Sequence, residues 1–384
     1  MRISFIISTY NRRDVLLHTI ERLDALRLSD FEIHVVDNAS SDGTAQAVAK
    51  LRWVRLHAQE INRGSCAKNV AIPHAHGEFI VFLDDDSYPQ PGSIQRMIAH
   101  FQDRTRLGAA TFAVTLPDGS RECSAFPNVF IGCGVGLRRS AIEQVGGLPD
   151  DFFMQAEEYD LSLRLLEAGW EVERFEDLHV THLKTPMART PQRTMRLDVR
   201  NNLMLIATYF PDEWAVPFCV DWLRRYWLIA SAKRQRRAFI LGMLQGAIAA
   251  MRRERKPVSA DTFEQFAKIE RIKAAMMKMR RDYQAQSILL IDLGKNMLPY
   301  WLAAKACGLH IPAIADNRLA GKRYRGIRIL SDDEARRMAF DVAVVSNSSP
   351  VHAQARAAQW RTLDRRRVLD LLQPGQEGSI ATAA

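Results

Sequence analysis

The chain has 384 residues, of which 47% are hydrophobic, and its formal net charge is +9 at pH 7. This length predicts two or three domains, and the hydrophobic fraction is sufficient for ordinary cores. The five cysteines include no CxxC pair, which argues against a disulfide framework or a zinc site and favours a reducing, cytoplasmic compartment.

Strands alternate with helices along the first part of the chain. We predict buried strands at residues 3–8, 31–36, 54–56 and 79–83, and helices at 13–28, 44–50, 64–75 and 92–101. Short strands and loops are expected over 107–136, and a further helix over 161–168. This alternation predicts a mostly parallel α/β sheet.

From about residue 190 to 283 the pattern becomes helical and basic, with arginine-rich tracts between apolar faces. A second α/β pattern follows, with strands expected at 288–292, 311–316 and 342–347 and a helix at 297–307. No window of about 18 uncharged apolar residues occurs, which argues against a transmembrane span. The apolar run at the N-terminus is also too short for a signal peptide.

An apolar run at residues 79–83 ends abruptly in three carboxylates, Asp84, Asp85 and Asp86. Three like charges at the mouth of a buried strand repel one another unless a cation lies between them. Their hard oxygen ligands suit Mg²⁺ or Mn²⁺. Ligands of open α/β sheets bind at the carboxyl ends of strands. The sequence therefore predicts a metal and, through it, a diphosphate; the alternative is a solvated acidic turn.

Two other predicted strands also end in polar residues, namely Ser8 to Arg12 and Asp37 with Asn38. In a parallel sheet these ends lie along one edge, so we expect them to form one site with the aspartates. Asp37 could accept a hydrogen bond from a base imide or a ribose hydroxyl, or could cap the turn beside Ser40.

Together these motifs resemble the family 2 glycosyltransferases of the GT-A fold, over residues 1–185. The segments that carry the resemblance are 6–12, 35–43, 62–64, 67–69, 82–86, 132–139, 145–148, 156–164 and 180–182. The resemblance implies an α/β GT-A domain with a Rossmann-like mixed sheet. It also implies inverting transfer of a sugar, a hexose or a deoxyhexose such as rhamnose, from a nucleotide-diphosphate sugar.

The resemblance also implies roles for individual residues. Asp37 would meet the nucleobase. Asp84 and Asp86 would form the metal-binding DxD element, with Asp86 the favoured direct ligand, and His182 would complete the metal site as in some relatives. The residues expected to bind the nucleotide sugar are Ser8, Thr9, Tyr10, Arg12, Asp37, Asn38, Lys68, Asn69, Asp84 and Asp85.

Inversion requires one in-line displacement, in which a carboxylate removes the proton of the attacking acceptor hydroxyl. The metal neutralises the departing nucleotide diphosphate. Glu157, Glu158 and Asp160 are the candidates for the base, and the family position matches Glu158, where Asp is also common. The choice between Glu157 and Glu158 stays open. The alternative is an acidic cluster that favours the dipole of a helix N-terminus.

The basic helices have two interpretations. They could meet acidic lipids at the inner face of the cell membrane, which would suit a lipid-linked acceptor, or they could form a solvated face that supports the catalytic domain. A glycan is the other acceptor class. Nucleic-acid binding is not expected, because only the net charge favours it.

The C-terminal segment resembles, more weakly, the N-terminal Rossmann-like domain of sugar acetyltransferases. Of the dinucleotide motif G-x-G-x-x-G it keeps only Gly294, which argues against NAD chemistry. We therefore predict a GT-A domain over 1–189, a basic helical region over 190–284, a Rossmann-like domain over 285–374 and a disordered tail over 375–384. The expected function is polysaccharide or glycolipid synthesis for the cell envelope; the alternative is a non-catalytic nucleotide-sugar scaffold or sensor.

Overall fold

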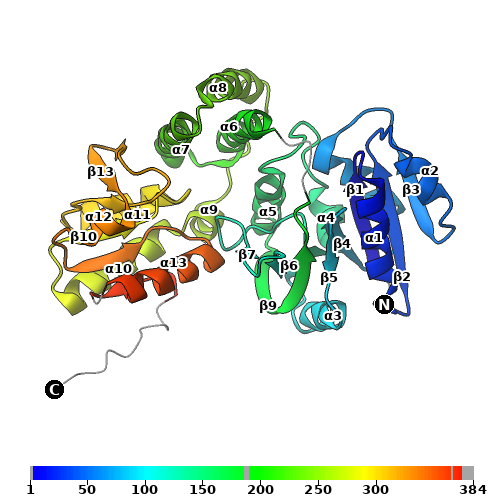
Figure 1. The fold of residues 1–384 in the computed structure, drawn as a ribbon, viewed down its shortest axis with the longest axis horizontal. Helices are drawn as coiled ribbons and strands as arrows, with labels where there is room; N and C mark the ends of the chain where they lie inside the picture. The colour runs from blue at the N-terminus through cyan, green and yellow to red at the C-terminus, as the bar shows by residue number, and fades with distance from the viewer. Residues whose placement is uncertain (1–2, 186–189, 365, 374–384) are drawn as a thin grey trace.

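The computed structural model describes residues 3–185, 190–364 and 366–373. Two α/β parts lie side by side, and the helices α6, α7 and α8 run along one side of the molecule where these parts meet (Figure 1). The predicted disordered tail, 375–384, and the predicted boundary at residue 189 lie outside the described residues.

The first sheet has the order β3-β2-β1-β4-β8-β6-β9-β5, with β7 paired to β6. Its strands are β1 (Ile3–Thr9), β2 (Phe31–Asp37), β3 (Val54–Ala58), β4 (Phe79–Asp84), β5 (Ser87–Pro89), β6 (Leu107–Thr115), β7 (Arg121–Glu122), β8 (Val135–Arg138) and β9 (Glu171–His182). Strands β1 to β4 are parallel, whereas β8 is antiparallel to both β4 and β6. The sheet is therefore mixed.

Both faces of this sheet are covered, which explains the nearly continuous apolar strands. The flanking helices are α1 (Arg13–Asp24), α2 (Thr44–Ala49), α3 (Ser93–Asp103), α4 (Arg139–Val145) and α5 (Glu157–Glu167). Phe5 and Ile7 of β1 pack with α1 and α3, and the intervening Ile6 packs with α4 and α5 on the other face. Successive residues of β1 thus pack into two separate hydrophobic cores, one on each face of the sheet.

Two of the predicted elements that differ in the structure contain a proline. Residues 64–75, expected to be one α-helix, form two 3₁₀ helices, Gly64–Val70 and Ile72–His74. Pro73 has no N–H for an α-helical bond. The strand expected at 311–316 is reduced to β11 (Ile314–Ala315), and Pro312 likewise removes a ladder donor ahead of it.

Five helices follow the first sheet: α6 (Pro191–Tyr209), α7 (Asp212–Ala232), α8 (Arg236–Ala250), α9 (Ala260–Ala267) and α10 (Ile269–Tyr283). Their core is aromatic, and Trp222 and Phe210 pack there with ring centroids 5.5 Å apart. Among the described helices, none combines the length and the apolar character that a bilayer crossing requires.

The second sheet has the order β12-β13-β11-β10-β14-β15. Its remaining strands are β10 (Ile288–Ile291), β12 (Arg323–Tyr324), β13 (Ile327–Leu330), β14 (Val342–Val345) and β15 (Val368–Leu369), and its helices are α11 (Met297–Ala306), α12 (Asp332–Ala335) and α13 (Pro350–Leu363). The fully buried Asp221 of α7 accepts hydrogen bonds from Tyr324 and Arg325, which ties this part to the helices. The predicted fold class, a GT-A sheet followed by helices and a small second α/β unit, is confirmed.

Candidate active site

The carboxyl ends of β1, β2 and β4 lie next to one another. Thr9 is in register with Asp37, and Ser8 is in register with Asp84. The structure therefore brings the three predicted polar strand ends to one edge of the sheet, which is the edge where ligands of open α/β sheets bind.

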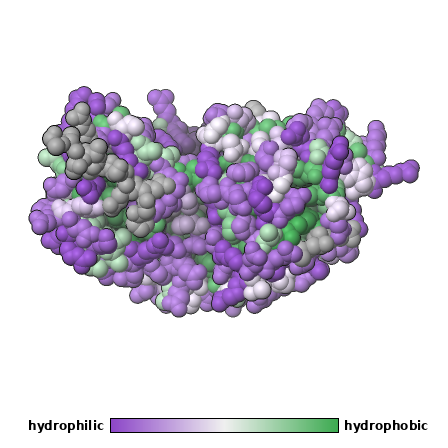
Figure 2. Space-filling model, turned by 90° about the horizontal axis from the view of Figure 1, so that it is seen from below, coloured by the Kyte–Doolittle hydropathy of each residue, from purple (hydrophilic) through white to green (hydrophobic). Residues whose placement is uncertain are grey.

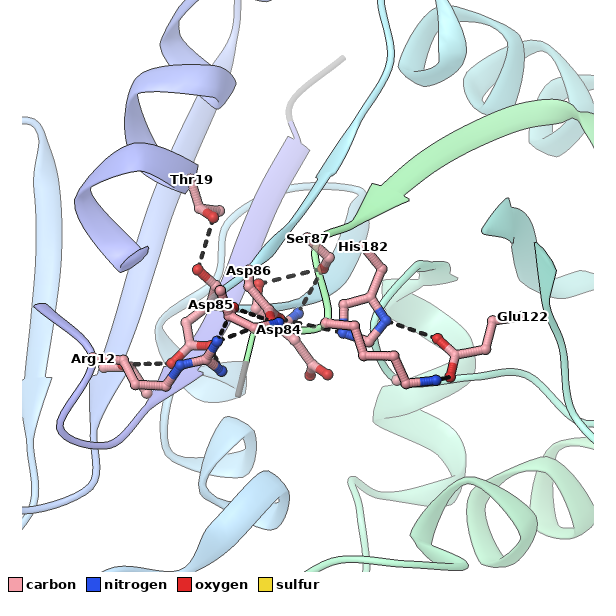
Figure 3. Close-up of polar contacts among 12 residues, drawn as sticks. Arg12, Thr19, Asp84, Asp85, Asp86, Ser87, Glu122 and His182 are labelled. Atoms are coloured by element: carbon pink, nitrogen blue, oxygen red, sulfur yellow. Dashed lines mark hydrogen bonds and ion pairs between the residues drawn. The ribbon is translucent and has the colours of Figure 1, made fainter. Parts of the chain in front are cut away.

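Arg12 holds the acidic loop that follows β4. Its guanidinium donates to Asp85 Oδ1 at 2.6 Å and to Asp86 Oδ2 at 2.9 Å, while Thr9 Oγ1 donates to Asp85 Oδ2 at 2.8 Å (Figure 3). Burial raises the pKa of Asp85 to about 7, against the opposing charge of Arg12. Arg12 thus pairs with two buried carboxylates and holds the loop after β4 in place.

His182 lies between two carboxylates, as Figure 3 shows. Its Nε2 is 3.3 Å from Asp86 Oδ1, and its Nδ1 is 2.8 Å from Glu122 Oε2. Burial alone would lower the pKa of His182, but hydrogen bonds with Asp86, Cys133 and Glu122 raise it to about 12. The ring is therefore an imidazolium that bridges β9 and β7.

This cluster fits a divalent cation. Ligand atoms of Asp84, Asp86 and His182 all lie within 4.8 Å of one another, and they supply two carboxylate oxygens and one imidazole nitrogen. A bound metal would replace the proton on Nε2. The contact of Glu122 with Nδ1 orients the ring for that purpose, as outer-shell carboxylates do for metal-ligating histidines.

Lys68 joins the acidic loop to the candidate base. Its ammonium, almost fully buried, lies 3.2 Å from Asp84 Oδ1 and 3.1 Å from the carbonyl of Gly132. A Cβ at Gly132 would lie 3.5 Å from Glu158 Oε1 and 3.8 Å from the Lys68 ammonium. A glycine at this position therefore leaves room between the aspartate cluster and Glu158.

Glu157 and Glu158 begin α5 and enter one shared cavity. Glu157 accepts a hydrogen bond from Ser65, while Glu158 has no hydrogen bond with another side chain within the described part of the chain. Burial, together with the charge of Glu157, raises the pKa of Glu158 to about 8. A buried carboxyl group with a raised pKa is suited to proton transfer near neutral pH.

Backbone strain lies directly before these glutamates. Phe153, Gln155 and Ala156 have φ angles of 67°, 74° and 66°, which residues other than glycine rarely adopt. The Asn201 amide of α6 donates to the carbonyls of Phe152, Met154 and Gln155 and so holds this turn. Strain of this kind concentrates at functional sites.

The cavity has a volume of about 330 Å³. The polar and aromatic residues that line it include Ser65, Lys68, Asp84, Glu122, Ser124, Glu157, Glu158, Tyr159, His182, Asp198, Tyr226 and Lys295. They come from the first sheet and its loops, from α6 and α7, and from the loop that precedes α11. All three parts of the fold therefore contribute to one cavity.

Asp160 lies outside this cavity. Its Oδ1 is 2.7 Å from the Arg164 guanidinium, and its Oδ2 accepts from Tyr209 at 2.9 Å and lies 3.3 Å from Arg253. Because these partners already occupy the carboxylate, Asp160 braces α5 against α6, and the two glutamates remain as candidates for the base.

Two family models match this chain. The model described as "Glycosyl transferase family 2" matches residues 4–123, and "Glycosyl transferase family group 2" matches residues 109–315, more than half of the chain. The chain belongs to glycosyl transferase family group 2. The two matches together cover the sheet edge, the glutamates and the α6 to α10 helices.

Curated relatives match this family group 2 member over less than a third of its length. The "Succinoglycan biosynthesis protein ExoO" of Rhizobium meliloti (strain 1021) is 36% identical over 115 residues, which are 29% of this chain and 32% of that protein. The "Poly-beta-1,6-N-acetyl-D-glucosamine synthase" of Staphylococcus aureus (strain MSSA476) is 31% identical over 114 residues, or 28% of this chain and 27% of that protein. The chain thus spans about a third or less of the length of these relatives.

Solved structures with a related shape include S. aureus TarS 1-349 in complex with UDP-GlcNAc. Its TM-score is 0.48 at 15% identity, over 80% of this chain and 93% of that chain. The mannosyltransferase PcManGT from Pyrobaculum calidifontis, in complex with GDP-Man and Mn²⁺, has a TM-score of 0.45 at 20% identity, over 80% of this chain and 86% of that chain.

Among the predicted nucleotide-binding residues, Asp37 and Tyr10 lie at the sheet edge, whereas Asn38 and Asn69 hold neighbouring loops. Asp37 keeps both of its interpretations: its Oδ2 accepts from the Ser40 backbone, whereas its buried Oδ1 has no partner among the described residues. Tyr10 is exposed beside this edge. The side chains of Asn38 and Asn69 instead bind backbone groups of neighbouring loops, so they shape the site from behind.

Sequence reasoning missed the wall of the cavity that the C-terminal part supplies. The Lys295 ammonium lies 3.9 Å from the ring centroid of Tyr159 and 4.5 Å from that of Trp222. Burial lowers the pKa of Lys295 to about 7, against the attraction of Asp198. Lys295 lies three residues after the predicted strand at 288–292, and that placement near a strand end was the available signal.

The loop that carries Lys295 is fixed on both sides. The Lys295 carbonyl accepts from Trp222 Nε1 at 2.9 Å, and Ser348 Oγ donates to the Ala125 carbonyl at 2.8 Å. A Cβ at Gly294 would lie only 2.6 Å from the Ser346 carbonyl, so the loops after β10 and β14 are in direct contact. The carboxyl edge of the second sheet therefore abuts the cavity.

Proposed function

We propose that the protein transfers a sugar, with inversion, from a nucleoside diphosphate sugar to a hydroxyl group of a glycan or a lipid-linked acceptor. The observation that carries this proposal is the shared cavity, in which Glu158 and the cluster of Asp84 with His182 face the same space. A proton acceptor and a site for a diphosphate are the two elements that this reaction needs.

Six side chains of the site have defined tasks in this proposal. Glu158 removes the proton from the attacking hydroxyl, and Lys68 places a positive charge beside Asp84, where the diphosphate would lie. Asp84, Asp86 and His182 would hold Mn²⁺ or Mg²⁺, which when bound neutralises charge on the leaving diphosphate. Asp37 offers a free buried oxygen to the nucleoside.

The named relatives support a product class. Proteins named for the synthesis of succinoglycan and of poly-N-acetyl-glucosamine match part of this chain, so we propose a cell-envelope polysaccharide or glycolipid as the product and the cytoplasm as the place of synthesis. The transferred sugar would be a hexose, an N-acetylhexosamine or a deoxyhexose such as rhamnose.

The test is release of nucleoside diphosphate from UDP-glucose, UDP-N-acetylglucosamine, GDP-mannose and dTDP-rhamnose, each with Mn²⁺, with Mg²⁺ and with EDTA. Turnover of one donor class with metal and none with EDTA is expected. Metal-dependent nucleotide binding without turnover of any donor, with octyl glycosides present as acceptors, would favour the non-catalytic scaffold instead.

Replacing Lys295 with Met should raise the KM for the acceptor by about 10- to 100-fold, because a hydrogen-bond donor that lines the cavity is lost. The KM for the donor should stay unchanged, since Lys295 lines the cavity from the C-terminal part. Octyl glycosides serve as acceptors, and Lys305→Met, an exposed lysine of the same segment, is the matched control. An unchanged acceptor KM in Lys295→Met would remove Lys295 from the acceptor site.

A further inference from the structure

The outer face of α8 is apolar and exposed. Leu241, Leu244 and Ile248 are 51%, 53% and 49% exposed, and Met251, at the end of the helix, is 79% exposed. Helix α8 lies at the edge of the molecule, beside α6 and α7 (Figure 1). Exposed large side chains of this kind rarely gather on a single helix of a soluble protein.

The opposite side of the molecule differs. In Figure 2, which views the molecule from the side away from α8, hydrophilic residues cover most of the surface and hydrophobic residues form small separate patches. Apolar side chains such as Ile61 and Met277 are also exposed elsewhere, but Leu241, Leu244 and Ile248 lie on successive turns of one helix.

Packing against α6 fixes which face of α8 points outward. A Cβ at Gly242 would lie 2.4 Å from the Arg196 carbonyl, and a Cβ at Gly246 would lie 2.9 Å from Leu203. The two glycines, one turn apart, let α8 approach α6 closely. The helix is thus held by its small residues, and its large apolar residues remain free.

Cations flank the apolar stripe at both ends. Exposed basic residues at the start of α8 are Lys233, Arg234, Arg236 and Arg237. After its end Arg252 is exposed, whereas Arg255 and Lys256 pair with Asp212 and Glu254. An apolar face bordered by long cationic side chains matches the interface of a bilayer, where the chains place their charges among the headgroups.

A groove between α6 and α8 adds a site for an anion. It has a volume of about 360 Å³, and Arg196, Arg200 and Arg252 line it together with Ile248 of the apolar stripe. Burial lowers the pKa of Arg200 against the attraction of Asp151, and the charges of Arg196 and Arg253 lower it further. Guanidinium groups in this arrangement suit the oxygens of a phosphate.

We propose that the outer face of α8 docks onto an anionic lipid bilayer, with the arginine groove binding the phosphate of a lipid headgroup. This inference goes beyond sugar transfer and does not depend on it. Asp198 of α6 lines the catalytic cavity, whereas Arg196 and Arg200, two residues to either side, line the groove. Docking would therefore place the cavity within about one helix diameter, roughly 10 Å, of the lipid surface.

The test is flotation of the full chain with vesicles of phosphatidylcholine, with and without phosphatidylglycerol. The chain should bind the vesicles that contain phosphatidylglycerol, and high salt should weaken this binding. Leu244→Glu should reduce vesicle binding by about tenfold or more. Arg252→Glu should reduce the preference for phosphatidylglycerol.

Two variants are matched controls. Met277→Glu changes a methionine of α10 that is 50% exposed, and Arg337→Glu reverses the charge of an exposed arginine outside α8 and its flanks. Both should bind vesicles as the wild type does, and circular dichroism should show an unchanged fold in all four variants. Sedimentation would test a second copy as the occupant of the face.

Several results would overturn the proposal. These are a wild-type chain that stays in solution with phosphatidylglycerol vesicles, a Leu244→Glu variant that binds them as the wild type does, and a dimer in solution that Leu244→Glu dissociates. Sugar transfer from soluble donors to soluble acceptors should be the same in Leu244→Glu and the wild type, so failure of docking and failure of the proposed activity are separable.

Discussion

Glu158→Gln is expected to lower sugar transfer by about 100- to 10,000-fold, because the amide cannot accept the proton of the attacking hydroxyl. Donor binding should remain, since the nucleotide end of the site lies at β1, β2 and β4. Gln has nearly the same shape as Glu, so the variant should fold. Single-turnover transfer and calorimetric binding of the nucleoside diphosphate measure the two effects separately.

The pH profile identifies the base more directly. Because burial and the charge of Glu157 raise the pKa of Glu158 to about 8, its carboxylate form should increase as the pH rises through the neutral range. The active form is the carboxylate, so wild-type transfer should rise with pH and level off above the pKa. Glu157→Gln should shift this limb to lower pH, because it removes a neighbouring negative charge. If Glu157→Gln abolishes transfer while Glu158→Gln does not, Glu157 is the base and Glu158 is the neighbouring charge.

Residues close in sequence to a strand end could be placed from the sequence. The apolar run at 79–83 and its aspartates define both the strand and the edge where it ends, whereas the register of Ser8 with Asp84 comes from the structure. Local signals suffice there, because one buried strand and its next few residues form the relevant unit.

Residues that reach the cavity from distant segments could not be placed in this way. Glu122 contacts His182 across 60 residues, and Lys295 packs on Tyr159 across more than a hundred. No periodicity or motif encodes such contacts, since they depend on how the second sheet docks against the helices. The same limit applies to Asp160, whose position beside two glutamates in sequence does not reveal that Arg164 and Tyr209 hold it elsewhere.

The surroundings of Asp85 and Asp86 explain why the two aspartates should differ in their importance for metal binding. Asp85 is buried between Thr9 and Arg12, and its raised pKa shows that its neutral form is tolerated at that position. For Asp86, burial would raise the pKa, but hydrogen bonds with His182, Thr185 and Arg12 hold it well below its usual range. Asp86 is thus an anion at any ordinary pH, as a metal ligand must be.

Asp86→Asn should therefore weaken Mn²⁺-dependent binding of nucleoside diphosphates by about 100-fold or more, since a direct ligand exceeds outer-shell partners in effect. Asp85→Asn is the matched control: it changes the adjacent carboxylate in the same way and should retain Mn²⁺ binding. Calorimetry with UDP, GDP, dTDP and CDP, each with Mn²⁺ and with EDTA, measures both variants. Wild-type, metal-dependent binding by Asp86→Asn would show that the cation is held elsewhere, and the cluster of Glu122, Cys133 and His182 would be the next site to test.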